Sequence, residues 1–315
     1  MRVLFFGTSG FAVPTLDALH AAAPRHEILS VVTQPDRPSG RGMQIAVSPI
    51  KARAATLGYP VLQPEKVRRK PFPAEVAAMQ PDALVVISFG QIIPQGVLDV
   101  PRFGGINVHA SLLPRWRGAA PIHWAILSGD SETGVATMQM EATLDTGAVY
   151  FEAREPIHPD DTVQTLEPRL AALGGALLVR TLDALEAGTV TPTPQTETGM
   201  TYAQMITRET GFLDPQTQGA AAMERIVRAL LPRPGATISV ADKPLKVLAA
   251  TVLPGGAAGV PGTVAAVWKD GIAVASADGV LLLTRVQPEN KAAMGAADYA
   301  RGARVGVGDL VSAGR

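Results

Sequence analysis

The segment from residue 104 to residue 121 constrains the fold of this chain more strongly than any other. Within it, Asn107, His109 and Ser111 alternate with small apolar residues, and a period of two is typical of an extended strand. Three hydrogen-bonding side chains are therefore expected along one face of a strand, with apolar side chains on the other face. A proline three residues after the last of them is expected to end the strand.

A carboxylate follows in a tight turn, after a second apolar strand that is predicted over residues 134–140. The turn is the Leu-Asp-Thr-Gly sequence of residues 144–147. Taken singly, a histidine on a strand is usually structural, and an aspartate before Thr-Gly is usually a turn former. Together, however, Asn107, His109 and Asp145 supply an oxyanion donor, a proton carrier and a carboxylate to orient the imidazole. Their conjunction favours an active site for acyl transfer.

The chain opens with an apolar strand over residues 2–6, a turn from Gly7 to Gly10 and a helix over residues 14–23. Dinucleotide-binding folds begin in this order, but the two glycines do not fit G-x-G-x-x-G and no acidic residue ends the next strand. The sequence therefore disfavours a nicotinamide site. Further strands are predicted over residues 28–33, 60–62, 82–88 and 150–155, and helices over residues 48–57, 121–127 and 163–185.

Composition narrows the classes of function. The 315 residues carry 28 basic and 28 acidic side chains, so any binding of RNA must come from a local basic face rather than from an overall positive field. There is no cysteine, which excludes disulfides, thiolate nucleophiles and zinc–thiolate sites. No apolar run reaches the roughly 18 residues of a membrane span, and the first run is too short for a signal peptide. We therefore expect a soluble, cytoplasmic protein without membrane contact.

The composition and the hydrophobic pattern of the sequence change after residue 187. Residues 187–204 are rich in Thr, Pro, Gly and Glu without periodicity, which predicts a linker. A helix is predicted over residues 218–231, followed by short apolar segments that are separated by Asp-Gly at 270–271 and 278–279, both hairpin signals. Such a series of short strands predicts a small β-barrel. Cations available for a basic face on it are Lys243, Lys246, Lys291, Arg301 and Arg304.

The sequence INVHASLLPRWRGAAPI over residues 106–122 resembles the signature of the folate-dependent formyltransferases. The resemblance covers nearly the whole chain and is most specific through its first two thirds. It implies a doubly wound, mostly parallel α/β domain of formyltransferase type, followed by a small OB-like β-barrel. Further matching segments are residues 7–8, 11–12, 33–38, 132–135, 138–140 and 144–147.

The resemblance also implies a reaction. The donor would be 10-formyltetrahydrofolate and the acceptor the α-amine of initiator methionyl-tRNA, giving N-formylmethionyl-tRNA for translation initiation. Asn107 would stabilise the oxyanion, and His109 would carry the proton, because histidine is the side chain that titrates closest to neutral pH. Asp145 would orient the imidazole, directly or through water. No metal is implied.

Binding residues and domains follow from the same resemblance. The loop over residues 34–44 would reach the acceptor end of the tRNA, with Arg37 and Arg41 as phosphate contacts, although Met-Gln at 43–44 stands where family members carry lysines. The residues expected to contact the folate are Ser111, Leu112, Leu113 and Pro114, and the backbone of Gln91 and Ile92. The expected divisions of a monomer are a catalytic domain (1–187), a linker (188–206) and an OB-like tRNA-binding domain (207–315).

Two alternatives stay open. The same Asn-His-Asp core serves family members that formylate glycinamide ribonucleotide, an amino-sugar nucleotide or another small amine, but the barrel and the loop with Arg37 and Arg41 favour tRNA. A non-catalytic RNA-binding protein on the same scaffold is disfavoured by the intact core. Ser111 is not expected to be a nucleophile, since the chain has no G-x-S-x-G elbow and its spacing from His109 on a strand is too wide for a nucleophile–base bond.

Overall fold

The computed structural model describes residues 1–39, 44–141, 143–254 and 259–314, and the chain falls into two compact units. The first unit comprises Met1–Pro121, Glu132–Pro156 and Glu167–Tyr202. The second comprises Ile122–Ser131, Ile157–Leu166 and Ala203–Arg315. The second unit therefore includes two short pieces, residues 122–131 and 157–166, that interrupt the first unit in the sequence.

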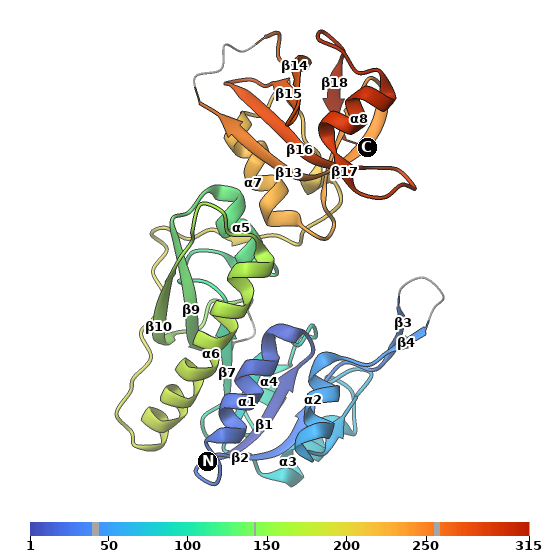
Figure 1. Ribbon diagram of the computed structural model, residues 1–315. Helices are drawn as coiled ribbons and strands as arrows, with labels where there is room; N and C mark the ends of the chain where they lie inside the picture. The colour runs from blue at the N-terminus through green and yellow to red at the C-terminus, as the bar shows by residue number, and fades with distance from the viewer. Residues whose placement is uncertain (40–43, 142, 255–258, 315) are drawn as a thin grey trace. The chain divides into compact units, whose positions relative to one another are not determined.

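A seven-stranded sheet forms the centre of the first unit (Figure 1), in the order β10-β9-β7-β6-β1-β2-β5. The strands are β1 (Arg2–Gly7), β2 (Glu27–Val32), β5 (Val61–Leu62), β6 (Ala83–Ile87), β7 (Gly105–His109), β9 (Glu132–Gln139) and β10 (Val149–Pro156). The first five of these run parallel, whereas β9 is antiparallel to both of its neighbours. Because helices cover both faces, the central strands are continuous apolar runs. The predicted doubly wound, mostly parallel sheet is confirmed.

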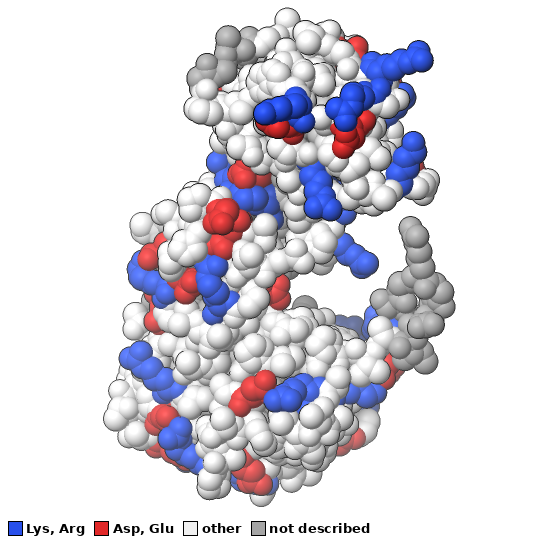
Figure 2. All heavy atoms as spheres, in the orientation of Figure 1, with Lys and Arg blue, Asp and Glu red and all other residues white. Residues whose placement is uncertain are grey.

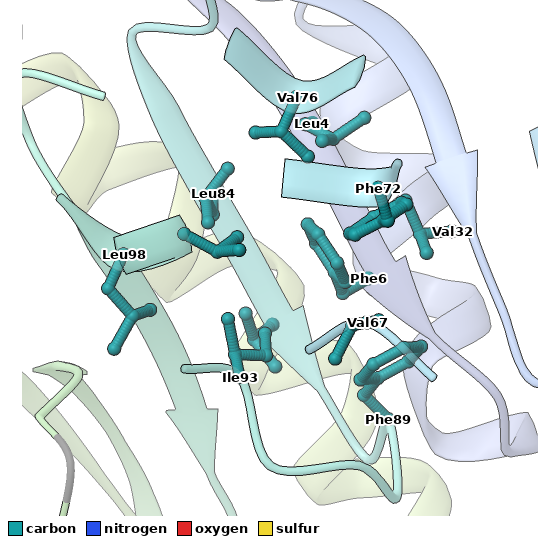
Figure 3. Packing of buried hydrophobic residues seen from close by; sticks show 12 residues of the cluster. Leu4, Phe6, Val32, Val67, Phe72, Val76, Leu84, Phe89, Ile93 and Leu98 are labelled. Carbon is teal, nitrogen blue, oxygen red and sulfur yellow. The ribbon is translucent and has the colours of Figure 1, made fainter. Parts of the chain in front are cut away.

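One face of this sheet packs on α3 (Phe72–Met79) and α4 (Gln95–Leu98). Figure 3 shows the buried cluster between them, in which the rings of Phe6 and Phe89 meet edge to face at 5.2 Å. Residues from β1, β2 and β6 interlock there with residues from the two helices, as close packing of an interior requires. The cluster ties the turn after β6 to the core, and this turn borders a cleft described below.

The opposite face packs on α1 (Val13–Ala21) and α6 (Val163–Glu186). Gly174 and Gly175 lie in the middle of α6, where side chains would obstruct this packing. A Cβ on Gly174 would lie 2.9 Å from Cγ1 of Val108, and a Cβ on Gly175 would lie 3.0 Å from the carbonyl oxygen of Pro14. The two glycines therefore allow α6 to approach β7 and α1 closely.

The segment predicted as one long loop over residues 34–44 is structured at both ends. β3 (Arg37–Ser39) pairs antiparallel with β4 (Gln44–Ala46), so the prediction of a continuous loop was wrong. A short ribbon escaped prediction because residues 34–44 contain two Pro and two Gly and the strands are three residues each. After it, Ser48 begins α2 (Pro49–Leu57) by accepting a hydrogen bond from the backbone N–H of Lys51 at 3.1 Å.

The second unit contains an antiparallel sheet in the order β14-β15-β16-β13-β12-β18. Its two edges meet: the N–H of Val264 donates to the carbonyl of Asp309 at 2.9 Å, and the N–H of Val311 donates to that of Gly262 at 2.8 Å. The sheet thus curls into the OB-like barrel that was predicted. Its strands are β12 (Ala236–Val240), β13 (Lys243–Leu253), β14 (Thr263–Trp268), β15 (Gly271–Ala275), β16 (Val280–Pro288) and β18 (Val311–Ala313), with β17 (Met294–Gly295) beside β16.

Helices complete the second unit. Arg225 of α7 (Ala220–Leu230) donates to the carbonyl of Leu127 in α5 (Pro121–Ser128) at 3.0 Å, and Arg228 donates to the carbonyl of Asp161 at 2.6 Å. These two bonds join residues 122–131 and 157–166 to the rest of the second unit. The elements of the whole chain that remain, from both units, are η1 (Gly10–Ala12), β8 (Arg117–Gly118), β11 (Tyr202–Ala203), η2 (Glu209–Gly211) and α8 (Ala296–Ala303).

Charges of both signs are interspersed over the face drawn in Figure 2, in keeping with the formal net charge of zero. Two of the five barrel cations predicted to form a basic face have partners: Lys246 donates to the carbonyl of Pro232 at 2.9 Å, and Arg301 pairs with Asp298. Within the described ranges, no helix is long and apolar enough to cross a membrane.

Candidate active site

β7 carries Asn107 and His109 to the carboxyl-terminal edge of the sheet, where ligands of open α/β sheets bind. The two side chains share a face because they are two residues apart on one strand. His109 is only 6% exposed, whereas Asn107 is half-buried. The strand thus fixes an amide and an imidazole side by side, as the sequence predicted.

Ser111 does not continue this polar row, so its predicted place on the strand was wrong. β7 ends at His109, and Ser111 lies in the turn that follows, with no solvent-exposed surface. Its hydroxyl donates to the carbonyl of Arg115 at 2.6 Å. This bond offers a local alternative to strand pairing, as serine side chains commonly do, and it leaves the hydroxyl occupied inside the protein.

Asp145 reaches the same place from the turn between β9 and β10. Its Oδ2 accepts a hydrogen bond from the backbone N–H of Gly118 at 2.9 Å, and its Oδ1 lies 3.4 Å from Nδ2 of Asn107. Oδ2 also lies 3.7 Å from Nδ1 of His109, which is a charge contact rather than a hydrogen bond. The structure therefore brings all three predicted catalytic side chains together. The φ angle of Asp145 is +52°, a conformation that aspartate tolerates better than most residues.

The neighbours of His109 determine which ring nitrogen is basic. Nε2 lies 2.9 Å from the carbonyl oxygen of Trp116, and because a carbonyl can only accept, Nε2 carries the hydrogen. In the neutral ring Nδ1 is then the acceptor, and it faces the Asp145 carboxylate. This arrangement leaves the lone pair of Nδ1 free to take up a proton, next to a negative charge that stabilises the imidazolium formed.

The residues predicted to bind folate fall into two groups. Gln91 and Ile92 line a cleft of about 610 Å³ at the carboxyl ends of β1 and β6, next to the point where the strand order reverses. Ile92 is 85% exposed. The Gln91 side chain, by contrast, accepts from the N–H of Val67 at 3.0 Å and donates to the carbonyl of Pro64 at 3.3 Å. Only its backbone is therefore available to a ligand.

The other group, residues 111–114, belongs to the loop beside His109. Leu113 is 7% exposed and packs on Ala136 and Met138, while Leu112 and Pro114 are half-buried. Neither this loop nor the three side chains predicted to be catalytic line the 610 Å³ cleft. Both groups follow the carboxyl ends of adjacent strands, β6 and β7.

Of the two arginines predicted to bind tRNA, Arg37 is exposed and lines the cleft. Arg41 lies outside the described residues, as does Met43. The same cleft is lined by Lys66 and Arg68, both exposed. Sequence reasoning missed these two cations, although they stand in the run KVRRK over residues 66–70.

Main-chain groups and the segment over residues 193–201 supply contacts that the sequence did not reveal. The N–H of Trp116 donates to the hydroxyl of Thr201 at 2.9 Å. The side chain of Gln195 donates to the carbonyls of Asp145 and Gly147, both at 2.8 Å. No periodicity marks these residues, so only the folded structure brings them to the site. Over the described ranges, no three His, Cys, Asp or Glu side chains are grouped to hold a metal ion.

Comparison with known proteins identifies the family. Residues 1–182 match the family described as "Formyl transferase", and residues 205–304 match "Formyl transferase, C-terminal domain". The methionyl-tRNA formyltransferase of Halorhodospira halophila is 47% identical over 310 residues, which span 98% of this chain and 99% of that protein. That of Myxococcus xanthus is 46% identical over 307 residues, 98% of this chain and 96% of that protein.

A solved structure shares the fold. HypX from Aquifex aeolicus, in complex with tetrahydrofolic acid, matches with a TM-score of 0.62 at 20% identity, over 95% of this chain and 47% of that one. The family predicted from residues 106–122 is confirmed by both domain matches and by relatives of nearly full length. The chain belongs to the formyl transferase family, and the Halorhodospira halophila and Myxococcus xanthus relatives, which match it over nearly its full length, are methionyl-tRNA formyltransferases.

Proposed function

We propose that this chain transfers the formyl group of 10-formyltetrahydrofolate to the α-amine of initiator methionyl-tRNA, giving N-formylmethionyl-tRNA for translation initiation. The observation that carries the proposal is the meeting of Asn107, His109 and Asp145 at the end of β7. It occurs in a chain that matches methionyl-tRNA formyltransferases over nearly its whole length. The identity of 46–47% with methionyl-tRNA formyltransferases over nearly the whole chain favours tRNA over an amino-sugar nucleotide or another small amine as acceptor.

The three side chains divide the reaction between them. The amine of the acceptor attacks the formyl carbon, a C–N bond forms, and the carbonyl oxygen becomes an oxyanion. Asn107 donates its amide hydrogen to that oxygen, a contribution typically worth about 3–4 kcal/mol in the barrier. His109 accepts the proton of the attacking amine at Nδ1, and Asp145, 3.7 Å away, stabilises the imidazolium. The proton then passes to N10 of the folate as the C–N bond to the donor breaks.

The folate binds between the two groups of predicted residues. The backbone of Gln91 and the exposed side chain of Ile92 border it on one side, and residues 112–114 border it on the other. The hydroxyl of Ser111 is already bonded to the carbonyl of Arg115, so Ser111 contributes to the folate site by shaping the turn that holds residues 112–114. No residue of the site is assigned to a metal in this reaction.

The tRNA meets the cations at the rim of the cleft. Arg37, Lys66 and Arg68 line it, and Arg41, which lies outside the described residues, adds a further charge. Lys66 and Arg68 supply cations in a chain that has Met and Gln, rather than lysines, at residues 43–44. We assign residues 1–187 to catalysis, 188–206 to a linker and 207–315 to tRNA binding, in a monomer that acts in the cytoplasm.

The test is formyl transfer from 10-formyltetrahydrofolate to charged initiator methionyl-tRNA by the wild type and by His109→Ala. The variant is expected to lose at least about a hundredfold in kcat, as for a missing acid–base group. His158→Ala, which removes an exposed imidazole outside the site, is the matched control. Full activity of His109→Ala would refute the mechanism. Transfer only to an amino-sugar nucleotide would move the chain to another branch of the family.

A further inference from the structure

We infer that Gln195 is a positioning residue for the reaction, although it lies in the segment that the sequence assigns to a linker. Its side chain is half-buried and makes three hydrogen bonds. Nε2 donates to the carbonyls of Asp145 and Gly147, and Oε1 accepts from Nε of Arg117 at 2.9 Å. Each polar atom of the amide thus has a protein partner.

These bonds join the two loops that place the Asp145 carboxylate. The first loop holds Asp145 itself, whose φ of +52° is a strained conformation that persists only where surrounding contacts impose it. Gln195 supplies two such contacts, on either side of Thr146. The second loop holds Gly118, whose N–H donates to Asp145 Oδ2 at 2.9 Å. Through Arg117, Gln195 is bonded to the residue before that donor.

Arg117 strengthens the connection because it is itself buried. Its side chain is 4% exposed, and a buried guanidinium requires hydrogen-bond acceptors. Gln195 Oε1 supplies one of them, and Met200 Sδ, 3.0 Å from Nη1, lies beside it. Removal of the Gln195 amide would leave both Arg117 and two backbone carbonyls without these partners.

The same segment holds the loop that orients His109. The hydroxyl of Thr201 accepts from the N–H of Trp116 at 2.9 Å, and the carbonyl of Thr201 accepts from the N–H of Arg117 at 3.0 Å. The carbonyl of Trp116 in turn accepts from His109 Nε2. Residues 193–201 therefore position both members of the His–Asp pair, and Gln195 is the residue that bonds to the Asp145 loop.

Gln195 touches neither substrate nor reacting atoms in this assignment, so it acts through Asp145. The inference rests on the proposed formyl transfer and adds a requirement to it: the distance between Asp145 and His109 depends on a glutamine 50 residues further along the chain. Gln195→Leu keeps the approximate size of the side chain and removes all three bonds. It is expected to lower kcat tenfold to a hundredfold, with the KM values of folate and acceptor changed less than threefold.

The experiment is a double-mutant cycle of Gln195→Leu with Asp145→Ala. If Gln195 acts by placing Asp145, then adding Gln195→Leu to the Asp145→Ala variant lowers kcat by less than about twofold. The pH profile of kcat/KM in Gln195→Leu is expected to move in the same direction as in Asp145→Asn. Thr196→Ala is the matched control, because Thr196 is the exposed neighbour and its hydroxyl donates to the nearby carbonyl of Thr198.

Equal losses in both backgrounds, or an unchanged kcat in Gln195→Leu, would overturn the inference. If Gln195→Leu does not fold, Gln195→Glu replaces it in the cycle, because it keeps the acceptor for Arg117 and loses the two donors. The cycle is measured with whichever amine the wild type formylates. Failure to formylate methionyl-tRNA would therefore refute the proposed function, whereas an additive cycle with an active wild type would refute only the role of Gln195.

Discussion

Replacing Gly147 by alanine is expected to disable the site by a backbone collision. An added Cβ would lie 1.7 Å from the carbonyl oxygen of Gln139 and 2.9 Å from its carbonyl carbon. Since an ordinary contact between carbon and a neighbouring heavy atom needs about 3.5 Å, the two backbones must separate by roughly 1.8 Å. They are held together, however, by the hydrogen bond from the N–H of Gln139 to the carbonyl of Ala148 at 2.8 Å.

The magnitude follows from these two effects. Overpacking of this kind costs about 1–3 kcal/mol, and it lies near the upper limit here because the obstacle is backbone rather than a flexible side chain. Loss of the Gln139–Ala148 hydrogen bond adds about 1 kcal/mol, giving a free energy of unfolding lower by roughly 4 kcal/mol. Gly147 is two residues from Asp145, so the carboxylate moves as well. A misplacement of about 1 Å can lower a rate a hundredfold.

The assay combines denaturant unfolding with formyl transfer to methionyl-tRNA, both measured on Gly147→Ala and on Gly96→Ala. Gly96 lies in α4 with nothing within 4 Å of its would-be Cβ, so alanine there is expected to be neutral or to stabilise by up to about 1 kcal/mol. A Gly147→Ala variant with wild-type kcat and a free energy of unfolding within about 0.5 kcal/mol of the wild type would refute the reasoning. It would mean that the turn carrying Asp145 adapts without moving the carboxylate.

Three further predictions concern separate parts of the chain. Asn107→Ala is expected to lower kcat by about 10² to 10³ with little change in KM, because the amide acts on charge that develops in the transition state; a purely raised KM would contradict this. Replacing Lys66 and Arg68 by Gln is expected to weaken tRNA binding and to reduce the slope of log K against log salt by about 0.7–0.9 per lost phosphate contact, and an unchanged slope would exclude them from the interface. Burial lowers the pKa of His26 below its usual 6.5, although its bond to Asp183 acts in the opposite direction. Below about pH 6.5 the unfolded chain therefore binds a proton at this histidine more readily than the folded chain, and the wild type loses stability as the pH falls. In urea unfolding, the free energy of unfolding is expected to change less between pH 7.5 and 5.5 for His26→Gln than for the wild type. An equal change in the two proteins would count against this account.

The strands and the meeting of Asn107, His109 and Asp145 were predictable because each depends on residue type. Apolar runs specify buried parallel strands, and an amide, an imidazole and a carboxylate are chemically distinctive. The place of Ser111 was mispredicted because alternation continues in the sequence beyond His109, whereas the side chain of Ser111 bonds locally to Arg115 and ends the strand. A local hydrogen bond of this kind competes with the ladder and leaves no trace in the hydrophobic pattern.

The groups that orient the site were not predictable. The carbonyl of Trp116 and the N–H of Gly118 are main-chain groups, which every sequence offers at every position. Gln195 and Thr201 lie in a segment whose composition is that of a linker, and their partners are 50 and 85 residues away. Only pairing across the fold distinguishes them from the exposed polar residues beside them.

The adjacent glycines of α6 have a consequence for engineering a more thermostable variant. Replacing helical glycine by alanine is a common stabilising strategy, worth about 1 kcal/mol at each compatible site. At Gly174 and Gly175 the new methyl groups would meet Val108 and the backbone of Pro14 at 2.9 and 3.0 Å, so the helix would be pushed off the strand that carries His109. A library that rewards heat resistance alone would therefore discard substitutions at these two positions, because the low intrinsic helix propensity there is what allows a helix to support the active-site strand directly.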